Sequence, residues 1–408
     1  MLKNYFKIAI AVLKRRKFFT FISLFGISFT LTILIVLAAF IDNEVSANYP
    51  ELNRDRSLYI ISIQQRDTVH QGQRTGPASF YYLSHYAATL KTPAKVAISS
   101  MFSATNTYVN DKKLVINMKY TNEDFWDVFQ FKFLEGKSYT KQQIENGERV
   151  AVISEDTKKE YFGDVPSVVG KYIEADNVQY RVIGVVKSVP VTMLIYYGDL
   201  FVPYTVSKAD WRTKTYTGSY SAVLLANSKT DLPKIQAEYA NVVSKIPPEN
   251  KDYTVLISSA DDYLTSFMSL NNKSNGVTIL FTIILGFALF IMLLPTLNLI
   301  NINISRIMER SSEIGVRKAF GASSRTLVWQ FIIENIILTI IGAAIGLLVS
   351  FIIIQVINNS NIIPNIHLTL NFTVLLYALI ACLVFGLLSG VYPAWRMSRM
   401  QVVTALKA

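Results

Sequence analysis

The chain has 408 residues, of which 51% are hydrophobic, with one cysteine and a formal net charge of +11 at pH 7. One cysteine excludes an intrachain disulfide, so a domain outside a membrane must fold around its own hydrophobic core. The apolar residues gather in four blocks almost without charge, residues 18–41, 277–300, 327–357 and 371–393. Each block approaches or exceeds the roughly 20 residues that cross a bilayer, and none has the polar stripe of a core helix in a soluble protein. The sequence therefore predicts a multi-pass α-helical membrane protein with four spans.

The distribution of charge predicts which side of the membrane each loop occupies. Lysine and arginine gather before the first block, between the second and third blocks, and after the fourth, whereas residues 358–370 contain none. Residues 42–276 carry equal numbers of cations and anions. By the positive-inside rule both termini, including the tail at residues 394–408, are cytoplasmic. Residues 42–276 then form a large extracytoplasmic domain, with residues 358–370 as a short loop on the same side.

Residues 1–17 are predicted to form a cytoplasmic amphipathic helix that lies on the lipid surface. Apolar residues recur there at steps of three and four, and three of the lysines lie off that stripe. A cleaved signal peptide has a similar pattern. The apolar block that follows is longer than the usual apolar region of such a peptide, which favours an uncleaved first span.

The extracytoplasmic domain contains two similar strand–helix–strand units on either side of an insert. The units are residues 57–64, 79–90 and 95–100, and residues 221–226, 232–245 and 253–258. This arrangement predicts an α+β domain with a split β-α-β unit of the ferredoxin type. The insert at residues 105–204 is predicted to be mainly β. Its strands are expected at residues 113–119, 149–154, 180–186 and 199–203, with helical pieces at 122–129 and 155–162.

A basic segment, residues 301–326, separates the second and third apolar blocks. It alternates charged and apolar side chains, which is typical of a short amphipathic helix. Gly321 is expected to end this helix, because glycine accepts the left-handed conformation found at helix C-termini. Ser323 is expected to cap the helix that follows.

Two pairs of small residues lie in the third and fourth blocks, Gly342 with Gly346 and Gly386 with Gly390. Such pairs allow another helix to approach closely, so they predict packed helices more firmly than a dimer interface. Glu334 is the carboxylate inside the apolar blocks. A charge there is costly, so it is either a functional residue or a side chain that reaches the cytoplasmic interface or a nearby cation.

No motif for catalysis or metal binding is found. Residues 136–138 read Gly-Lys-Ser, like the end of a phosphate loop, but Phe131 stands where the first glycine of that loop belongs. They are interpreted as a polar turn. His70, His85 and His367 lie too far apart for metal-ligand spacing. The sequence therefore predicts a chain that is not itself an enzyme and binds no metal or cofactor.

Residues 309–322, ERSSEIGVRKAFGA, carry the most specific resemblance in the chain. They resemble the ER-x-x-EIG-(I/V)-R-x-A-x-GA segment of the FtsX-like, MacB-type permeases of ABC transporters. Residues 331–334, with their glutamate, and residues 392–396, YPAWR, also resemble that family. The tail departs from it, because Thr404 stands where glutamate is usual and Val403 where a proline-like residue is often found. The resemblance spans the chain.

The resemblance implies an architecture and a set of partners. One span, a large periplasmic domain and three spans would form the permease, with a porter-like subdomain at residues 57–104 and 205–260 and a Sabre-like insert at 105–204. Two protomers, identical or paralogous, would assemble with separate ABC ATPase chains that hold ATP and magnesium. The basic segment would be the coupling helix that contacts the ATPase, with lipid headgroup binding as the alternative. The residues assigned to this contact are Glu309, Arg310, Glu313, Ile314, Gly315, Val316, Arg317, Lys318 and Gly321.

The function that the resemblance implies is mechanotransmission across the bacterial inner membrane. The permease would transmit ATP-driven motion to its periplasmic domain for efflux or export, with a periplasmic adaptor and an outer-membrane channel, and without nucleic acid. The alternatives are a lipoprotein-releasing permease, a cell-division-type regulator of peptidoglycan hydrolases, and a membrane sensor or scaffold without an ATPase. The cell-division type usually has a smaller outward domain.

Overall fold

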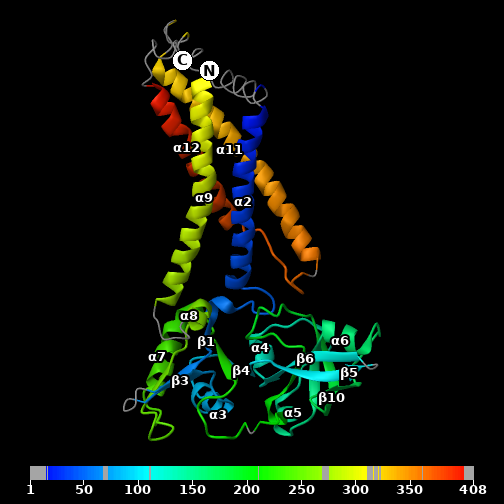
Figure 1. The fold of residues 1–408 in the computed structure, drawn as a ribbon. Helices are drawn as coiled ribbons and strands as arrows, with labels where there is room; N and C mark the ends of the chain where they lie inside the picture. Colours follow the sequence, from blue (N-terminus) through cyan, green and yellow to red (C-terminus); the bar gives the residue numbers. More distant parts are fainter. Residues whose placement is uncertain are drawn as a thin grey trace. The chain divides into compact units, whose positions relative to one another are not determined.

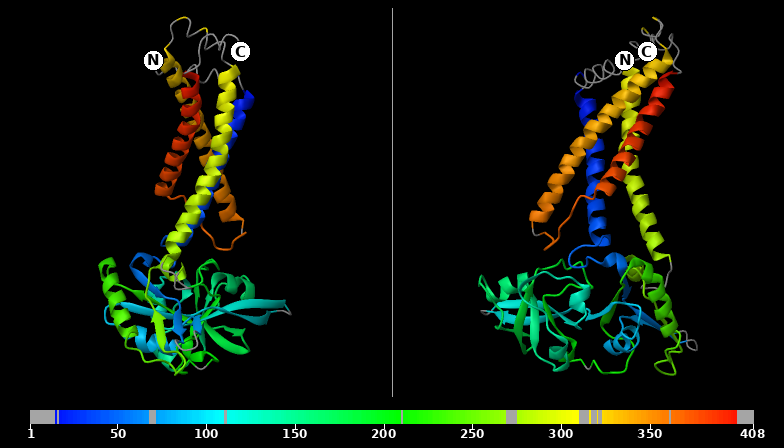
Figure 2. Two further views of the ribbon diagram at one scale, coloured as in Figure 1. Left: turned by 60° about the vertical axis from the view of Figure 1, so that its left-hand side comes forward. Right: turned by 180° about the vertical axis from the view of Figure 1, so that it is seen from behind.

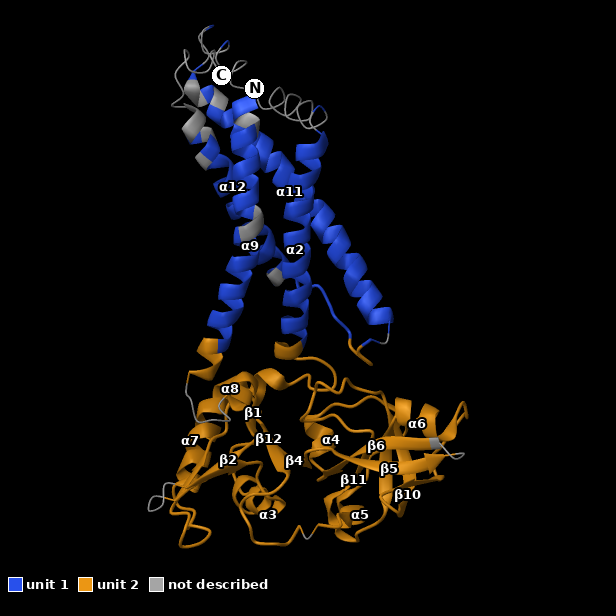
Figure 3. Ribbon diagram, viewed as in Figure 1, with its two compact units in different colours: residues 1–43, 280–362, 367–408 blue, residues 44–279, 363–366 orange. Residues whose placement is uncertain are grey.

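The computed structural model describes residues 15, 17–67, 72–109, 112–209, 211–268, 275–309, 316, 320, 323–360 and 362–398 (Figure 1). The chain forms two compact units (Figure 3). Unit 1 comprises residues 1–43, 280–362 and 367–408, and unit 2 comprises residues 44–279 and 363–366. The predicted interfacial helix at residues 1–17 and the tail at 394–408 lie largely outside the described residues.

Unit 1 is built from long helices (Figure 2). They are α2 (Lys17–Val45), α9 (Gly276–Glu309), α11 (Ser324–Asn359) and α12 (Phe372–Ser398). Among the described residues, α2, α9 and α11 are long and apolar enough to cross a membrane. The apolar part described in α12, Leu375–Val391, is shorter, so the fourth span stays a prediction.

Unit 2 contains a ten-stranded sheet and a three-stranded sheet. The ten-stranded sheet has the order β1-β12-β4-β6-β11-β8-β10-β7, with β5 paired to β6 and β9 paired to β10. Its strands are β1 (Ser57–Ile60), β4 (Lys95–Ser100), β5 (Ser103–Val109), β6 (Lys112–Thr121), β7 (Phe133–Gly136), β8 (Val150–Ser154), β9 (Tyr172–Ala175), β10 (Val178–Val186), β11 (Leu200–Pro203) and β12 (Tyr220–Leu225). The smaller sheet has the order β13-β2-β3, with β13 (Val255–Ser258), β2 (Ile63–Arg66) and β3 (Gln73–Gly76).

The strand pairing places β12 between β1 and β4 and antiparallel to both. This is the order of a split β-α-β unit, with α3 (Phe80–Tyr82) between β1 and β4 in the sequence and α7 (Leu232–Val243) between β12 and β13. The single strand predicted at residues 57–64 is wrong in detail. The chain changes sheets after Ile60, because β1 pairs with β12 whereas β2 pairs with β13.

The helix predicted at residues 79–90 begins with a cap and ends early. Ser79 Oγ accepts a hydrogen bond from the Tyr82 N–H at 2.9 Å, which satisfies a free donor in the first turn. A π-helical turn, Leu83–Ala87, replaces the rest of the α-helix. The apolar face of the segment is kept, since Tyr82 and Leu83 are fully buried.

The insert contains more strands than the sequence predicts. The four expected segments correspond to β6, β8, β10 and β11, and the helical pieces correspond to α4 (Phe125–Val128) and α6 (Glu155–Phe162). The prediction missed β5, β7 and β9, which each pair on one side only. The expected polar turn at residues 136–138 is wrong at its first residue, because Gly136 ends β7 and pairs with Gly184 of β10.

Candidate functional site

The predicted ATPase contact begins at the end of α9. Glu309 and Met308 are exposed there. Val316 and Phe320 are also exposed, and the Phe320 N–H donates to Val316 O at 3.0 Å, as in one turn of helix. Ser323 caps α11 as predicted, accepting from the Thr326 N–H at 3.2 Å. The other residues assigned to this contact lie outside the described residues, and they are Arg310, Glu313, Ile314, Gly315, Arg317, Lys318 and Gly321.

Three apolar side chains are exposed at this end of unit 1. Met308, Val316 and Phe320 are 54%, 46% and 90% exposed. A phenylalanine almost fully in water gains free energy when a partner or a lipid surface covers it. These side chains suit a contact that forms only in an assembly.

The glycines of α11 lie against α2. A Cβ on Gly342 would stand 2.7 Å from Ile27 Cγ2, and one on Gly346 would stand 2.9 Å from Ser28 O. Thr32 Oγ1 donates to Gly346 O at 3.2 Å across the same contact. Only a residue without a side chain allows the two backbones to come this close.

The glycines of α12 lie against α11. A Cβ on Gly386 would stand 2.3 Å from Thr339 Oγ1, and one on Gly390 would stand 2.6 Å from Asn335 Nδ2. Both pairs of glycines therefore serve contacts within this chain. The same helix pair packs along its length (Figure 2).

A buried polar cluster joins three of the apolar helices. Asn303 of α9 donates through Nδ2 to Asn335 Oδ1 of α11 at 2.9 Å and to Ser389 O of α12 at 3.1 Å. Asn303 is 5% exposed and Asn335 is 7% exposed. In an apolar environment an interhelical hydrogen bond of this kind contributes about 1 kcal/mol. The cluster fixes the register of α9 against α11 and α12.

Glu334 lies beside this cluster and is 3% exposed. Gln330 Nε2 donates to Glu334 Oε1 at 3.2 Å within α11. Sequence reasoning singled out Glu334 but missed Asn303. The signal for Asn303 was a group of three asparagines, Asn298, Asn301 and Asn303, at the end of an apolar stretch of α9, because a buried polar side chain there needs a partner.

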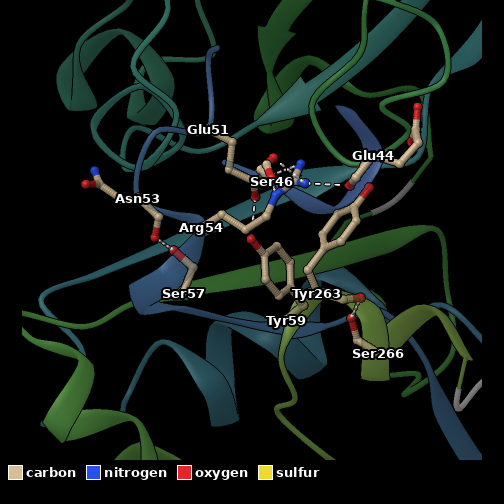
Figure 4. A network of polar contacts seen from close by, with 9 residues as sticks. All are labelled: Glu44, Ser46, Glu51, Asn53, Arg54, Ser57, Tyr59, Tyr263 and Ser266. Carbon is tan, nitrogen blue, oxygen red and sulfur yellow. Dashed lines mark hydrogen bonds and ion pairs between the residues drawn. The ribbon is translucent and has the colours of Figure 1, made fainter. Parts of the chain in front are cut away.

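A second buried polar network lies in unit 2, centred on Arg54 (Figure 4). Arg54 belongs to a short 3₁₀ helix, η1 (Arg54–Arg56). Its Nη1 donates to Glu44 O at 2.6 Å and Ser46 O at 3.0 Å, and its Nε donates to Glu51 Oε2 at 2.8 Å. The guanidinium carbon lies 3.9 Å from the ring centre of Tyr263, a cation–π contact.

Glu51 completes this network from the other side. It accepts from the Tyr59 hydroxyl of β1 at 2.5 Å. Glu51, Arg54 and Tyr59 are 1%, 6% and 0% exposed. Burial raises the pKa of Glu51, although Arg54 and the Tyr59 hydroxyl oppose the shift. Burial also raises the pKa of Tyr59 well above its usual value, and Glu51 adds to the shift.

The Arg54 network joins chain segments that are far apart in sequence. Glu44 lies in the last turn of α2, and Ser46 follows that helix. Tyr59 lies in β1, and Tyr263 lies in α8 (Tyr263–Met268), which precedes α9. The Tyr59 N–H donates to Asp261 O at 2.8 Å, which ties β1 to the same final segment. The first and last segments of unit 2 are therefore held together by one guanidinium and its partners.

A third buried charge lies where the two parts of unit 2 meet. Lys119 of β6 is 0% exposed, and its Nζ donates to Ser100 O at 2.7 Å and Leu194 O at 3.4 Å. Burial lowers the pKa of Lys119 to about 7. The β4–β6 ladder beside this lysine is a single residue pair, Ser99 with Thr121. The split unit and the insert also share a hydrophobic core, in which Tyr59 and Ala97 are buried together with Phe125 and Phe201.

Comparisons with known proteins match both units. Residues 20–242 match a family model described as the MacB-like periplasmic core domain, and residues 276–402 match the FtsX-like permease C-terminal model. The chain is 22% identical over 317 residues to the ABC transporter permease YknZ of Bacillus subtilis, covering 77% of this chain and 75% of that protein. It is 22% identical over 409 residues to the macrolide export ATP-binding/permease protein MacB of Acinetobacter baylyi, covering 99% of this chain but 59% of MacB.

Several solved structures are similar to part of the chain. One of them is the periplasmic region of MacB from Actinobacillus actinomycetemcomitans, with a TM-score of 0.37 and 17% sequence identity. The similarity covers 53% of this chain and 94% of the solved one.

The polar cluster of unit 1 leads to a first prediction. We expect Asn303→Leu to destabilise the full chain in detergent by about 1 kcal/mol or more, because Asn335 loses its interhelical donor. The matched control is Asn301→Leu, two residues away on α9, where the side chain is exposed. Thermal unfolding in detergent measures the melting temperature of both variants. Equal melting temperatures for the two variants would contradict the role given to Asn303.

Lys119 leads to a second prediction, about pH. Its pKa is about 7 in the folded chain against 10.5 in a solvated lysine. At pH values between these two pKa values the unfolded chain binds more protons than the folded chain. The free energy of unfolding therefore rises with pH over this range, because deprotonation removes the cost of burying the charged ammonium group. Below pH 7 the lysine is charged in both states and the penalty is fully present.

The variant Lys119→Met removes this buried charge. We expect it to raise the free energy of unfolding by about 2–5 kcal/mol at pH 6 and by less at pH 9. The size of the effect follows from the difference between the folded and unfolded pKa values of Lys119. Lys113→Met on the same strand is the control, because Lys113 is exposed. Denaturant unfolding at several pH values measures the effect, and a gain that does not vary with pH would refute it.

Proposed function

The chain belongs to the FtsX-like permeases of ABC transporters with a MacB-like periplasmic core domain, and on this premise we propose that it transmits force. A separate ATPase would bind and hydrolyse ATP with magnesium on the cytoplasmic side. The helices of this chain would carry the resulting motion to the periplasmic domain. The chain itself would catalyse nothing and hold no cofactor.

The observation that carries this proposal is the Arg54 network. It ties the segment that follows α2 to the segment that precedes α9 by hydrogen bonds, an ion pair and a cation–π contact. A domain whose two chain connections were loose would absorb a displacement of either helix locally. A domain whose connections are locked together transmits the displacement to its sheets.

The contacts within unit 1 support the same proposal. Asn303 joins three helices, and Gly342 and Gly346 bring α11 close to α2. A bundle fixed by close backbone contacts and polar bonds can move as a body. At its end, exposed Met308, Val316 and Phe320 suit an ATPase surface that covers them.

The direction of transport and the partners are part of the proposal. The Acinetobacter relative is named for macrolide export, which favours efflux from the bacterial inner membrane. We place both termini in the cytoplasm and unit 2 in the periplasm, on the charge distribution. A pair of permease protomers, two ATPases, a periplasmic adaptor and an outer-membrane channel would complete the assembly.

The test exchanges two charges of the proposed coupling helix. The double variant Glu313→Lys with Arg317→Glu keeps the net charge of the segment, so it leaves general attraction to anionic lipid headgroups unchanged. We expect it to reduce co-purification of the ATPase and to abolish transport. The control Lys17→Glu removes positive charge from the same side of the membrane and should leave both intact.

The two explanations of the basic segment predict opposite results. If the segment only binds lipid, the charge exchange leaves ATPase binding and transport unchanged. Unchanged ATPase binding and transport in the double variant would refute the coupling helix. A purification of the wild-type chain that brings down no ATPase would refute the proposed function as a whole.

A further inference from the structure

The connection between α11 and α12 contributes four residues to unit 2. Residues 363–366 belong to the same compact unit as residues 44–279, although the helices on either side belong to unit 1. The four residues, Ile-Pro-Asn-Ile, form a tight turn in which the Ile366 N–H donates to Ile363 O at 3.4 Å. Asn365 has φ 62°. Proline at the second position and asparagine with positive φ at the third are the signature of a type II turn.

Pro364 and Asn365 of the turn line a recess of about 340 Å³ whose other walls come from the insert, with polar and apolar side chains in similar share. Asn365 Nδ2 donates to Asp156 Oδ2 at 2.7 Å. Asp156 lies in the first turn of α6, and its N–H donates to Ser188 Oγ at 3.0 Å, which fixes the backbone that carries the carboxylate. A hydrogen bond to an ionised carboxylate is about twice as strong as one between neutral groups.

The recess is acidic and is not lined by a lysine or arginine. Glu160 and Asp199 also line it. The pKa of Glu160 is raised, mainly because the carboxyl is partly buried and further because the negative charges of Asp156 and Asp199 lie nearby. Asp199 is already occupied, since Oδ2 accepts from the Asn117 N–H at 2.9 Å and from Asn117 Nδ2 at 2.7 Å. Asp156 therefore lies near other carboxyl groups, where a hydrogen-bond donor such as the Asn365 amide stabilises its negative charge.

We propose that residues 363–366 are a tether that gives the insert its own mechanical link to α11 and α12. The Arg54 network connects the split unit to α2 and α9, whereas the Asn365–Asp156 hydrogen bond connects the start of α6 to the other two long helices through a tight turn. This inference rests on the proposed force transmission. It adds that the periplasmic domain receives motion at two places, one in each of its parts.

Three variants of the full chain test the docking. Asn365→Asp keeps a residue that tolerates positive φ but sets a carboxylate against Asp156. Combining it with Asp156→Asn restores a donor and an acceptor with their roles exchanged. Asn359→Asp is the control, because it makes the same chemical change at an exposed position at the end of α11.

Hydrogen exchange by mass spectrometry reads the docking without an ATPase. We expect Asn365→Asp to reduce the protection of residues 363–366 and of the start of α6 by about tenfold or more, the size of a charge-assisted bond. The double exchange should restore the protection, and Asn359→Asp should leave it unchanged. Unaltered protection in Asn365→Asp, or no recovery in the double variant, would overturn the tether.

The mechanical part is tested with the ATPase bound and ATP supplied. In the wild type we expect nucleotide-dependent exchange both near Tyr59 and in α6. In Asn365→Asp the response in α6 should be lost and the response near Tyr59 retained. A response in α6 that survives this variant would overturn the tether, whereas a wild type that responds nowhere would overturn the proposed force transmission instead.

Discussion

One buried guanidinium holds together the first and last segments of unit 2. Arg54 is almost inaccessible to water, so its charge must be compensated by protein groups. The compensation comes from Glu51, from two backbone carbonyls and from the face of Tyr263. Removing one partner of such a pair costs about 3–5 kcal/mol, because the other charge is left buried and alone. The path of the chain from residue 44 to residue 59, and the position of Tyr263, are thus set together.

The two units are stabilised by different forces. Unit 2 has clusters of buried aromatic and aliphatic side chains, such as Phe125, Phe129 and Phe201, which gain free energy by leaving water. A helix bundle in lipid gains nothing by moving apolar side chains from lipid to protein, so packing and polar contacts decide its structure. Gly346 against α2 and Asn303 between three helices are contacts of that kind. A single chain therefore uses hydrophobic burial outside the membrane and close approach inside it.

The sequence predicted the features that depend on local pattern. Long apolar stretches marked α2, α9 and α11, and continuous apolar runs marked β8 and β12, because these strands are buried on both faces. β5 was not predicted because most of its side chains are exposed, so its sequence shows little alternation of apolar and polar residues. β7 and β9 are only four residues long, which is too short for a clear period.

The polar sites depended on partners that no local pattern reveals. Glu51 and Arg54 are three residues apart and look like an exposed ion pair of a loop. Their burial follows from β1, which comes directly after them, and from α8, which lies far along the chain. Asn365 and Asp156 are separated by 209 residues, and their spacing contains no signal of a contact. The proline and asparagine of the turn were visible in the sequence, but not the recess that receives them.

The joint between the two parts of unit 2 shows what a second mechanical link adds. The split unit and the insert share one sheet, yet β4 and β6 pair through a single residue pair, supplemented by side-chain bonds such as Asn122 Oδ1 accepting from the Ile98 N–H. Lys119 is buried beside this pair without a carboxylate to stabilise its charge. A force that enters at the segment after α2 reaches the insert through this pairing, through the shared hydrophobic core, and through Tyr49, whose hydroxyl accepts from the Lys132 N–H and donates to Lys187 O, both at 3.1 Å. A tether at Asp156 acts on the start of α6 directly, at a second point of the insert.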